Sequence, residues 1–346
     1  MKHQTTRYGE IPFYKIGTFG NTADAFISKK LFLEYKTKYS FPKKGDILIS
    51  ASGTIGRAVI YDGKPAYFQD SNIVWIDNDE TLVKNDFLFY AYSNVKWNTE
   101  HTTILRLYND NFRNTLIPLP PLNEQIAIAN ILSDLEHYLY TLRALILKKE
   151  SVKKALSFEL LSQRKRLKGF NQAWQRVRLG DIANYLTSNL SVEQITQQGK
   201  IKVYDVNNFI GYTDTTFISD KPYISIVKDG SVGRVRILPP KTNILSTMGA
   251  LIANHRTTTE FLFYLLSNFD FKNFTSGSII PHIYFKDYKE KTIFLPPLNE
   301  QIAIANILSD LDSEIISLKN KKRQFDNIKK ALNHDLMSAK IRVLEK

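Results

Sequence analysis

The sequence predicts an α+β chain that contains two mixed α/β domains, each followed by one long helix. Three observations predict this architecture: a segment of seventeen residues that occurs twice, weaker matches around both copies, and an apolar stripe after each copy. The repeated segment, LPPLNEQIAIANILSDL, occupies residues 119–135 and 295–311. A chain that carries such a segment twice is expected to carry one structural unit twice.

The matches around the repeated segment extend over most of the chain. GEIPFY at 9–14 corresponds to GKIKVY at 199–204, SGTIGR at 52–57 to DGSVGR at 229–234, and FLFYAYSN at 87–94 to FLFYLLSN at 261–268. The offset between partners changes from 190 to 177, then to 174 and 176. The matching pieces should therefore form a common framework, and the unmatched pieces should form surface loops of different length.

The two domains are expected to be mixed in secondary structure. Stretches such as YISIVKDGSVGRVRIL at 223–238 alternate and turn like strands, whereas NDFLFYAYSN and TEFLFYLLSN each resemble a short helix. We expect the first domain at 1–121, its long helix at 122–168, the second domain at 169–297 and its long helix at 298–346.

The long helices are predicted from apolar residues that recur in steps of three and four. These residues are Leu132, Leu135, Leu139, Leu142, Ile146, Leu156 and Leu160 in the first copy, and Leu308, Leu311, Ile315, Leu318, Phe325, Leu332 and Leu336 in the second. A helix with so narrow a stripe needs a partner, and the other copy in the same chain can supply it. The expectation is an intramolecular coiled coil, with ordinary core of a helical bundle as the alternative.

Two further features of the helical segments concern their starts and their register. Proline is tolerated in a first helical turn, and Asn123 and Asn299 can cap the helices. Lysines interrupt both stripes, at Lys149, Lys153, Lys322 and Lys329. Such lysines can set the register of the two helices, or their stems can pack while the ammonium groups stay in water.

The charge balance predicts an anionic partner. The chain has 47 Lys and Arg against 34 Asp and Glu, a net charge of +13, which favours nucleic acid over a membrane surface. There is no cysteine, which excludes disulfides and thiolate metal sites and fits a cytoplasmic protein. No apolar run is long enough to span a bilayer.

The chain carries no sequence signature of a catalytic or nucleotide-binding site. GxxxxGK[ST], GxGxxG after a strand and HExxH are all missing. The Pro-Pro pairs lie between leucines, so they lack the polar and aromatic neighbours of the adenine methyltransferase motif. We therefore expect no catalytic residue, no metal and no cofactor in this chain.

The two glycine turns are the clearest candidates for a binding role. SGTIGR and DGSVGR are typical of hairpin turns, and each could present a hydroxyl group and a guanidinium to a phosphate or a base edge. A purely structural hairpin is the alternative. His282 is the one histidine in a suggestive setting, although a loop or core role is more common for such a residue.

At the repeated LPPLNEQIAIANILSDL the chain resembles the specificity subunit of type I restriction-modification enzymes. The resemblance covers nearly the whole length. It rests on the duplicated Pro-Leu-x-Glu-Gln helix start, on the KKAL segments at 153–156 and 329–332, and on the opening pattern WQRVRLGDI at 174–182.

The resemblance implies a fold, a function and a set of partners. The two domains would be target recognition domains, each reading one half of an asymmetric, bipartite double-stranded DNA site about one helical turn apart. The two helices would pack as an antiparallel coiled coil that sets the spacing, giving a pseudo-two-fold internal repeat. The subunit itself would be inactive. It would recruit two adenine-N6 methyltransferase (modification) subunits, and possibly restriction (motor and nuclease) subunits, which would use S-adenosylmethionine, ATP and Mg.

The first domain departs from the family pattern because it begins only eight residues before its GEIPFY segment. It lacks the Trp-Val-Leu-Gly-Asp-Ile opening that the second domain has at 174–182. A missing strand would leave an exposed sheet edge in the first domain.

The expected contact residues fall into two groups. The DNA-contact candidates are Lys43, Lys44, Ser52, Arg57, Arg106 and Arg113 in the first domain, and Lys228, Ser231, Arg234, Arg236, His255, Arg256 and Lys286 in the second. The candidates for contacts to modification subunits are Asn123, Glu124, Gln125, Asn299, Glu300 and Gln301, for which helix capping alone is the alternative.

Two other functions stay open at this point. One is a basic, two-lobed protein-protein scaffold that does not read DNA sequence, and it would show only salt-sensitive, non-specific DNA association. The other is a self-sufficient enzyme, which the missing nucleotide and adenosylmethionine motifs argue against.

Overall fold

The computed structural model describes residues 4–68, 72–97 and 105–343. The chain divides into two compact units, of which unit 2 is one continuous stretch and unit 1 combines two separate stretches. Unit 1 consists of Met1–Arg143 and Asn320–Lys346, and unit 2 is Ala144–Lys319. Each unit therefore contains one α/β domain, part of the long helix α4 (Leu122–Leu161) and part of the long helix α7 (Leu298–Met337).

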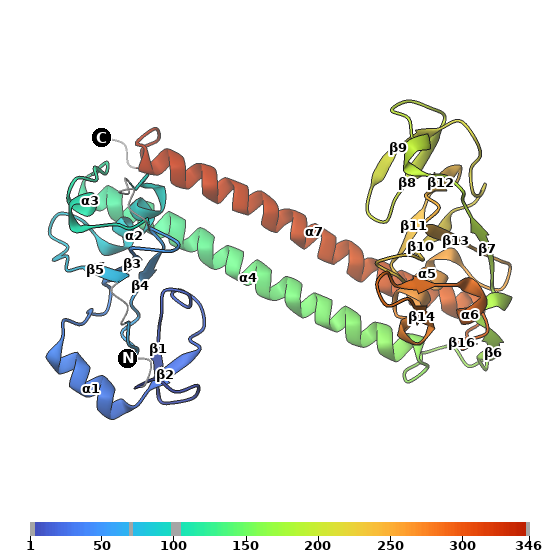
Figure 1. Ribbon diagram of the computed structural model, residues 1–346, viewed down its shortest axis with the longest axis horizontal. Coiled ribbons are helices and arrows are strands. Elements are labelled where there is room, and N and C mark those ends of the chain that lie inside the picture. Colours follow the sequence, from blue (N-terminus) through green and yellow to red (C-terminus); the bar gives the residue numbers. More distant parts are fainter. Residues whose placement is uncertain (1–3, 69–71, 98–104, 344–346) are drawn as a thin grey trace. The chain divides into compact units, whose positions relative to one another are not determined.

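Unit 1 has a small sheet region followed by helices (Figure 1). Its shorter elements are β1 Ile11–Phe13, β2 Ala25–Ile27, α1 Lys29–Lys38, β3 Ile47–Ser50, β4 Ala58–Ile60, β5 Ile73–Ile76, α2 Asn85–Asn94 and α3 Asn109–Arg113. β1 and β2 form an antiparallel pair, and a second antiparallel sheet has the order β4-β3-β5. Helix α2 buries Phe87 and Tyr90 against Ile128 and Leu132 of α4, which joins the domain to its helix.

Unit 2 has the same framework with more strands. Its shorter elements are β6 Gln175–Arg178, β7 Ala183–Thr187, β8 Ile201–Tyr204, β9 Phe209–Thr213, β10 Tyr223–Val227, β11 Val235–Leu238, β12 Thr242–Ile244, β13 Met248–Ala253, α5 Thr259–Ser267, β14 Thr275–Ser276, β15 His282–Ile283, α6 Phe285–Tyr288 and β16 Thr292–Leu295. Among the described residues its sheets have the orders β11-β10-β13-β7, β12-β8-β9, β14-β15 and β16-β6.

The predicted fold class is confirmed, because both units combine sheets with short helices and the long helices follow each domain. The two short predicted helices are α2 and α5, and the predicted glycine turns connect β3 to β4 and β10 to β11. The core of unit 2 places Phe261 and Leu262 of α5 between the sheet and the buried residues Ile304 and Leu308 of α7. The apolar stripe of each long helix therefore faces its own domain as well as the other helix.

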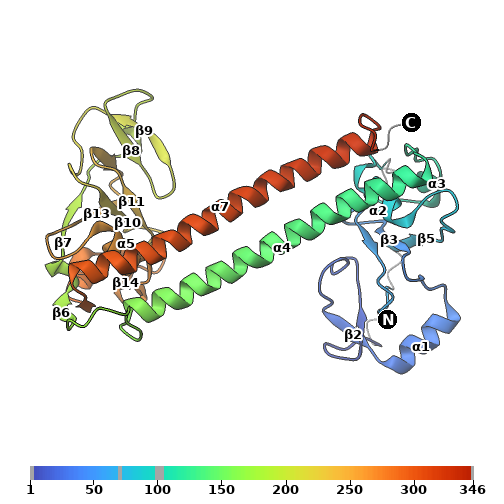
Figure 2. The same ribbon diagram turned by 180° about the vertical axis from the view of Figure 1, so that it is seen from behind.

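Within each unit the helix segments run antiparallel, side by side in both views (Figures 1 and 2). In unit 1 Lys329 of α7 pairs with Glu136 of α4, and in unit 2 Lys149 and Lys153 of α4 pair with Glu314 and Asp312 of α7. Three of the lysines that interrupt the stripes thus fix the register of the helix pair. The fourth, Lys322, pairs with Asp326 on its own helix.

The ends of the long helices differ from the expectation in detail. The helices begin at Leu122 and Leu298, so Asn123 and Asn299 lie inside the first turn rather than at the cap. Pro121 and Pro297 carry the carbonyl groups that accept the first helical hydrogen bonds. At the other end, Gln163 and Ala339 adopt left-handed backbone angles, φ 61° and 55°, at equivalent positions of the repeat, which ends both helices.

Candidate nucleic-acid interface

Each unit carries one glycine turn whose conformation depends on an aromatic side chain. Gly56 and Gly233 have φ angles of 80° and 79°, which favour glycine. A Cβ atom at Gly56 would lie 2.3 Å from Trp97, and one at Gly233 would lie 2.5 Å from Phe271. The second glycine of each turn is therefore required both by its backbone angle and by the ring packed against it.

Each turn is joined to a segment that comes more than fifty residues later. The amide of Leu107 donates to the Ala51 carbonyl at 2.8 Å, and the amide of Ile283 donates to the Lys228 carbonyl at 2.9 Å. Isolated β-bridges link Ser52 to Arg106 and Asp229 to His282 at the same places. The structure thus brings two distant segments of each domain together into one surface, which we call the turn surface of that unit.

The turn surface of unit 2 presents oriented cationic and polar side chains. His282 Nδ1 lies 2.7 Å from Asp229 Oδ1. Arg234 Nη2 donates to Asn207 Oδ1 at 2.7 Å, and Arg236 Nη1 donates to the Asn207 carbonyl at 2.9 Å. Because a guanidinium has five N–H donors, these bonds orient both arginines while leaving further donors for a ligand.

The turn surface of unit 1 keeps an arginine, Arg57, at the position of Arg234, but it differs at the two bridged positions. Arg57 Nη1 donates to the Phe19 carbonyl at 3.0 Å, and the Arg106 guanidinium lies 5.9 Å from the centre of the Tyr108 ring. Ser52 is buried beside Arg106. Two equivalent frameworks therefore carry unlike polar groups.

The structure places eight of the thirteen predicted DNA-contact residues on or beside the turn surfaces. Those on or beside them are Ser52, Arg57 and Arg106 in unit 1, and Lys228, Ser231, Arg234, Arg236 and Lys286 in unit 2. Lys286 follows Ile283 on the same segment, and its ammonium group lies 5.5 Å from the centre of the Tyr284 ring.

The other predicted DNA-contact residues lie elsewhere. Lys43 and Lys44 precede β3, whereas the turn follows it, and Lys43 Nζ pairs with Asp77 at 3.1 Å. Arg113 pairs with Asp110 on α3. His255 and Arg256 follow β13 at the end opposite the turn, and Arg256 donates to Gln175. A DNA contact of any of these residues stays a prediction.

Several side chains of the turn surface of unit 2 were not among the predicted contacts. Asn207 and Tyr204 orient the two arginines, since Arg236 lies 5.3 Å from the centre of the Tyr204 ring. Asp229 orients His282 from 53 positions away. No local pattern links these partners, so only the fold could bring them together.

The start of each long helix is tied to the domain by a buried glutamine. Gln301 Oε1 accepts from the Thr258 amide at 3.1 Å, and Gln301 Nε2 donates to the Arg256 and Pro296 carbonyls. Gln125 makes the equivalent contacts: its Oε1 accepts from the Lys84 amide at 2.8 Å, and its Nε2 donates to the Leu82 and Pro120 carbonyls. The repeated glutamines thus fix the angle at which each helix leaves its domain.

The neighbouring glutamate binds an arginine that follows the end of the other helix. In unit 2 Glu300 is fully buried and accepts from Arg166 Nη2 at 2.6 Å and from Trp174 Nε1 at 3.0 Å. In unit 1 Glu124 accepts from Arg342 Nε at 2.7 Å and from the Val343 amide at 3.3 Å. The hydrogen bonds from Arg342 lower the pKa of the Glu124 carboxyl.

These contacts bear on the residues predicted to bind modification subunits. Glu124, Gln125, Glu300 and Gln301 are buried and bonded inside their units. Asn123 and Asn299 are exposed, as are Leu122, Ile126, Leu298 and Ile302 on the same turns. Partner contact stays a prediction for the six residues, and the structure adds four exposed apolar neighbours.

The lowered pKa of Glu124 predicts a pH dependence for the stability of unit 1. Because the folded state lowers this pKa below its ordinary value of 4.5, the stabilisation is complete above that value and is lost as pH falls through the lowered pKa. The free energies of unfolding of the parent and of Glu124→Gln, measured with urea, should differ at pH 7, and the difference should shrink at a pH well below 4.5. An equal difference at both pH values would contradict this account. Because the other carboxyl groups are present in both proteins, their contributions cancel in the difference between parent and variant.

Among the described residues no cluster of His, Cys, Asp or Glu could hold a metal ion. No helix in the described ranges is long and apolar enough to cross a bilayer.

Comparison with known proteins decides the family. Residues 1–150 and 171–325 match the family described as the type I restriction modification DNA specificity domain. The chain belongs to the type I restriction-modification specificity family. The two matched ranges correspond to the two predicted domains with the first part of their helices.

Individual specificity subunits agree with this assignment. A type I restriction enzyme specificity subunit of Methanocaldococcus jannaschii, MjaVIII, is 26% identical over 362 aligned positions, which cover 92% of this chain and 84% of that protein. A candidate specificity subunit of Haemophilus influenzae is 64% identical over 137 residues, but the match spans only 36% of its length and 39% of this chain.

The fold also agrees with a solved specificity subunit. The crystal structure of the type I restriction-modification S subunit from M. genitalium superposes with a TM-score of 0.63 at 20% identity, and the match covers 97% of this chain and 91% of that one. Members of the specificity family thus share the arrangement of elements seen here.

Proposed function

We propose that this member of the specificity family is a non-catalytic subunit whose two turn surfaces each read one half of an asymmetric, bipartite DNA site. The observation that carries the proposal is the β-bridge beside each turn. The same backbone position holds Ser52 and Arg106 in unit 1 but Asp229 and His282 in unit 2. Equivalent frameworks with different side chains at the point of contact are what two unlike half-sites require.

The charge of the turn surfaces supports a nucleic-acid ligand. Arg57 and Arg106 lie on unit 1, and Lys228, Arg234, Arg236 and Lys286 lie on or beside the turn surface of unit 2. Arginine can donate two hydrogen bonds to the O6 and N7 atoms of guanine, and lysine and arginine also bind phosphate. The hydrogen bonds from Arg234 and Arg236 to Asn207 reduce the conformational freedom that the side chains would lose on binding.

Recruitment of two modification subunits is the second part of the proposal. The first turns of α4 and α7 are identical in sequence, and both expose the same residues: Leu122, Asn123 and Ile126 in one, Leu298, Asn299 and Ile302 in the other. Two copies of one exposed surface suit two copies of one partner. The buried Glu and Gln of the same segments would act indirectly, by holding each helix start against its domain.

The remaining partners follow from the same proposal. Adenine-N6 methylation with S-adenosylmethionine, and cleavage driven by ATP and Mg, would be carried out by the modification and restriction subunits. This chain would act with them on chromosomal and incoming DNA in the cytoplasm. It would supply the choice of site and no reacting group.

Single alanine variants on the two turn surfaces should each alter one half of the recognition site. In cells that express the cognate modification subunit, N6-methyladenine would be mapped for Arg106→Ala and for His282→Ala. Loss of one base contact costs about 1–3 kcal/mol. We therefore expect methylation of the recognition site to drop roughly 5- to 150-fold in each variant, with the sequence preference relaxed in one half-site only. Lys43→Ala and His255→Ala replace predicted contact residues that lie away from the turns, so the same experiment tests whether the readout extends beyond the turn surfaces.

Two outcomes would contradict the proposal. A palindromic methylated motif would mean that the two turn surfaces read the same sequence. Equal, salt-sensitive binding to all DNA sequences by the chain together with its modification subunit would instead favour a scaffold without sequence readout.

A further inference from the structure

A hairpin of unit 2 carries two exposed isoleucines beside the turn surface. Strands β14 and β15 are joined by Gly-Ser-Ile-Ile-Pro at 277–281, and Ser276 pairs with His282 at the base of this loop. Ile279 is 92% exposed, more than any other large apolar side chain in the described part of unit 2, and Ile280 is 55% exposed. Turn positions usually carry Gly, Pro, Asn, Asp or Ser. The side chain of Ile279 therefore gains almost no burial from the fold of unit 2 itself.

The conformation of this loop is fixed by its own backbone and by the glycine turn. Gly277 has a φ of 90°, and a Cβ atom there would collide with the Ile280 carbonyl oxygen, so this position requires glycine. The amide of Gly230, in the turn DGSVGR, donates to the Pro281 carbonyl at 2.9 Å. The loop thus rests against the turn surface of unit 2, and its tip is held in the solvent in a defined position.

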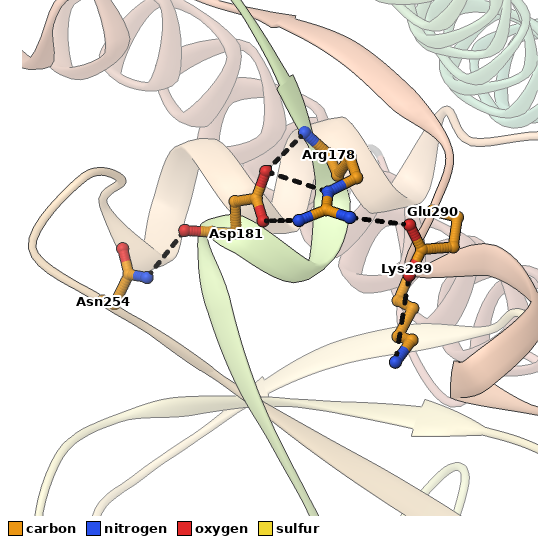
Figure 3. A network of polar contacts seen from close by, with 5 residues as sticks. All are labelled: Arg178, Asp181, Asn254, Lys289 and Glu290. Carbon is orange, nitrogen blue, oxygen red and sulfur yellow. Dashed lines mark hydrogen bonds and ion pairs between the residues drawn. The ribbon is translucent and has the colours of Figure 1, made fainter.

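The segment that begins with β15 is anchored at both ends. At its start the Ile283 amide donates to the Lys228 carbonyl, and the Ile283 side chain is buried. At its end, beyond α6, Glu290 pairs with Arg178 at 3.1 Å, and Arg178 also donates to Asp181 (Figure 3). The base of the hairpin is therefore firmly held inside its unit, so little conformational freedom would be lost when the tip meets a ligand.

Cationic side chains lie on the segments next to the loop. Lys228 and Arg234 flank the turn against which the loop packs, and Lys286 lies on α6, which follows β15. The carboxylate of Asp229, the acidic residue of the turn, is bound to His282. An apolar tip inside a basic surface suits a polyanion that also offers an apolar group.

Duplex DNA offers such a group at the base edges of the major groove, the C5 methyl group of thymine. The major groove also admits a two-stranded β-ribbon, which is the form of the β14–β15 hairpin. Contact between an isoleucine and this methyl group removes apolar surface of both from water. The arginine and lysine side chains nearby read hydrogen-bond acceptors, so the methyl group would be a separate element of recognition.

We infer, in an extension that rests on the proposed function, that Ile279 contacts the C5 methyl group of one thymine in the half-site read by unit 2. Ile279 is thus a specificity-determining residue for an A·T base pair. Ile280 and Pro281 extend the apolar surface of the tip beside it. The half-site of unit 2 accordingly contains an A·T pair at one fixed position.

Duplexes that differ by a single methyl group test this contact. The thymines of the recognition site are replaced one at a time by deoxyuridine, which lacks only the C5 methyl group. Affinity is measured by fluorescence anisotropy with the full chain in complex with its modification subunits. The parent is compared with Ile279→Ala, Ile279→Val and Ile316→Ala. The last is the matched control, because Ile316 is 58% exposed on α7 of the same unit.

One uracil is expected to lower the affinity of the parent about three- to tenfold, as for the loss of roughly one buried methyl group. Ile279→Ala should lose at least as much on the thymine duplex and nothing further from that uracil. Ile279→Val should keep part of the sensitivity, and Ile316→Ala should behave like the parent.

The opposite results are equally distinct. Full sensitivity to every uracil in Ile279→Ala would overturn the inference. So would a loss of the same size on the thymine and uracil duplexes, which would favour insertion of the tip between base steps. A complex that no longer assembles in Ile279→Ala would assign the tip to a protein contact instead.

Failure of the inference can be told apart from failure of the proposed function. A parent that binds its site specifically but is insensitive to every uracil would overturn the thymine contact and leave the proposed function standing. Equal binding of the parent to unrelated duplexes would contradict the proposed function itself and the thymine contact with it.

Discussion

Trp174→Ala is expected to lower the free energy of unfolding of unit 2 by about 3–5 kcal/mol, the usual cost of emptying a buried aromatic site. Trp174 is 8% exposed and belongs to the largest apolar cluster of the molecule's described part. Its Nε1 also donates to the fully buried carboxylate of Glu300. The substitution therefore removes packing and a hydrogen bond to a charged group at once.

The measurement separates the two units because of where the tryptophans lie. Trp75 and Trp97 belong to unit 1 and Trp174 to unit 2. In Trp174→Ala the remaining fluorescence reports unit 1, while circular dichroism reports both units. We expect the circular dichroism transition to shift to lower urea concentration and the fluorescence transition to stay in place. A common shift of both signals would contradict separate cores.

Trp174→Phe divides the effect into its two parts. The ring of phenylalanine keeps most of the apolar contact but has no N–H. The loss relative to the parent should be about 1.5–3 kcal/mol, the value of a hydrogen bond to a charged group. A loss as large as that of the alanine variant would mean that the bond to Glu300 dominates.

The second large effect is expected from the equivalent leucines of the two long helices. Leu132 and Leu308 have no exposed surface, and each packs in the core of its own unit. Substitution of either by alanine should cost about 2–5 kcal/mol. Because the two residues lie in separate clusters, the costs should add to within about 0.5 kcal/mol in the double variant.

Ile131→Ala serves as the control for this pair. Ile131 neighbours Leu132 on the same helix but is 38% exposed, so its loss should change the stability by about 0.5 kcal/mol or less. Differential scanning calorimetry of the parent and the four variants measures all of these effects. A strongly non-additive double variant would show that the two cores unfold as one.

Much of the framework could be predicted from the sequence because its segments occur there in two copies. The repeat predicted the long helices, the short helices α2 and α5, and the glycine turns, since each copy supported the other. The spacing of apolar and glycine residues was enough to predict an element wherever that element depends on contacts along one segment.

The contacts that shape the candidate site could not be predicted in this way. Glu300 binds Arg166, and Asp229 binds His282, although each pair is far apart in the sequence. Neither residue of such a pair looks unusual alone. The burial of Glu124 and Glu300 was missed for the same reason: charged residues at a helix start are usually solvated, and only the arginine from the other helix changes that.

The division of the chain into units has a consequence for its synthesis on the ribosome. Unit 2 is one continuous stretch, Ala144–Lys319, so it is complete as soon as its last residue has emerged. Unit 1 needs the final segment of α7, from Asn320 onward, which is made about 200 residues after Arg143. At about 5–20 residues per second, the earlier domain waits roughly 10 to 40 s without the part of α7 that packs against α4 in unit 1. The part of the protein that is translated first is therefore the part that finishes folding last.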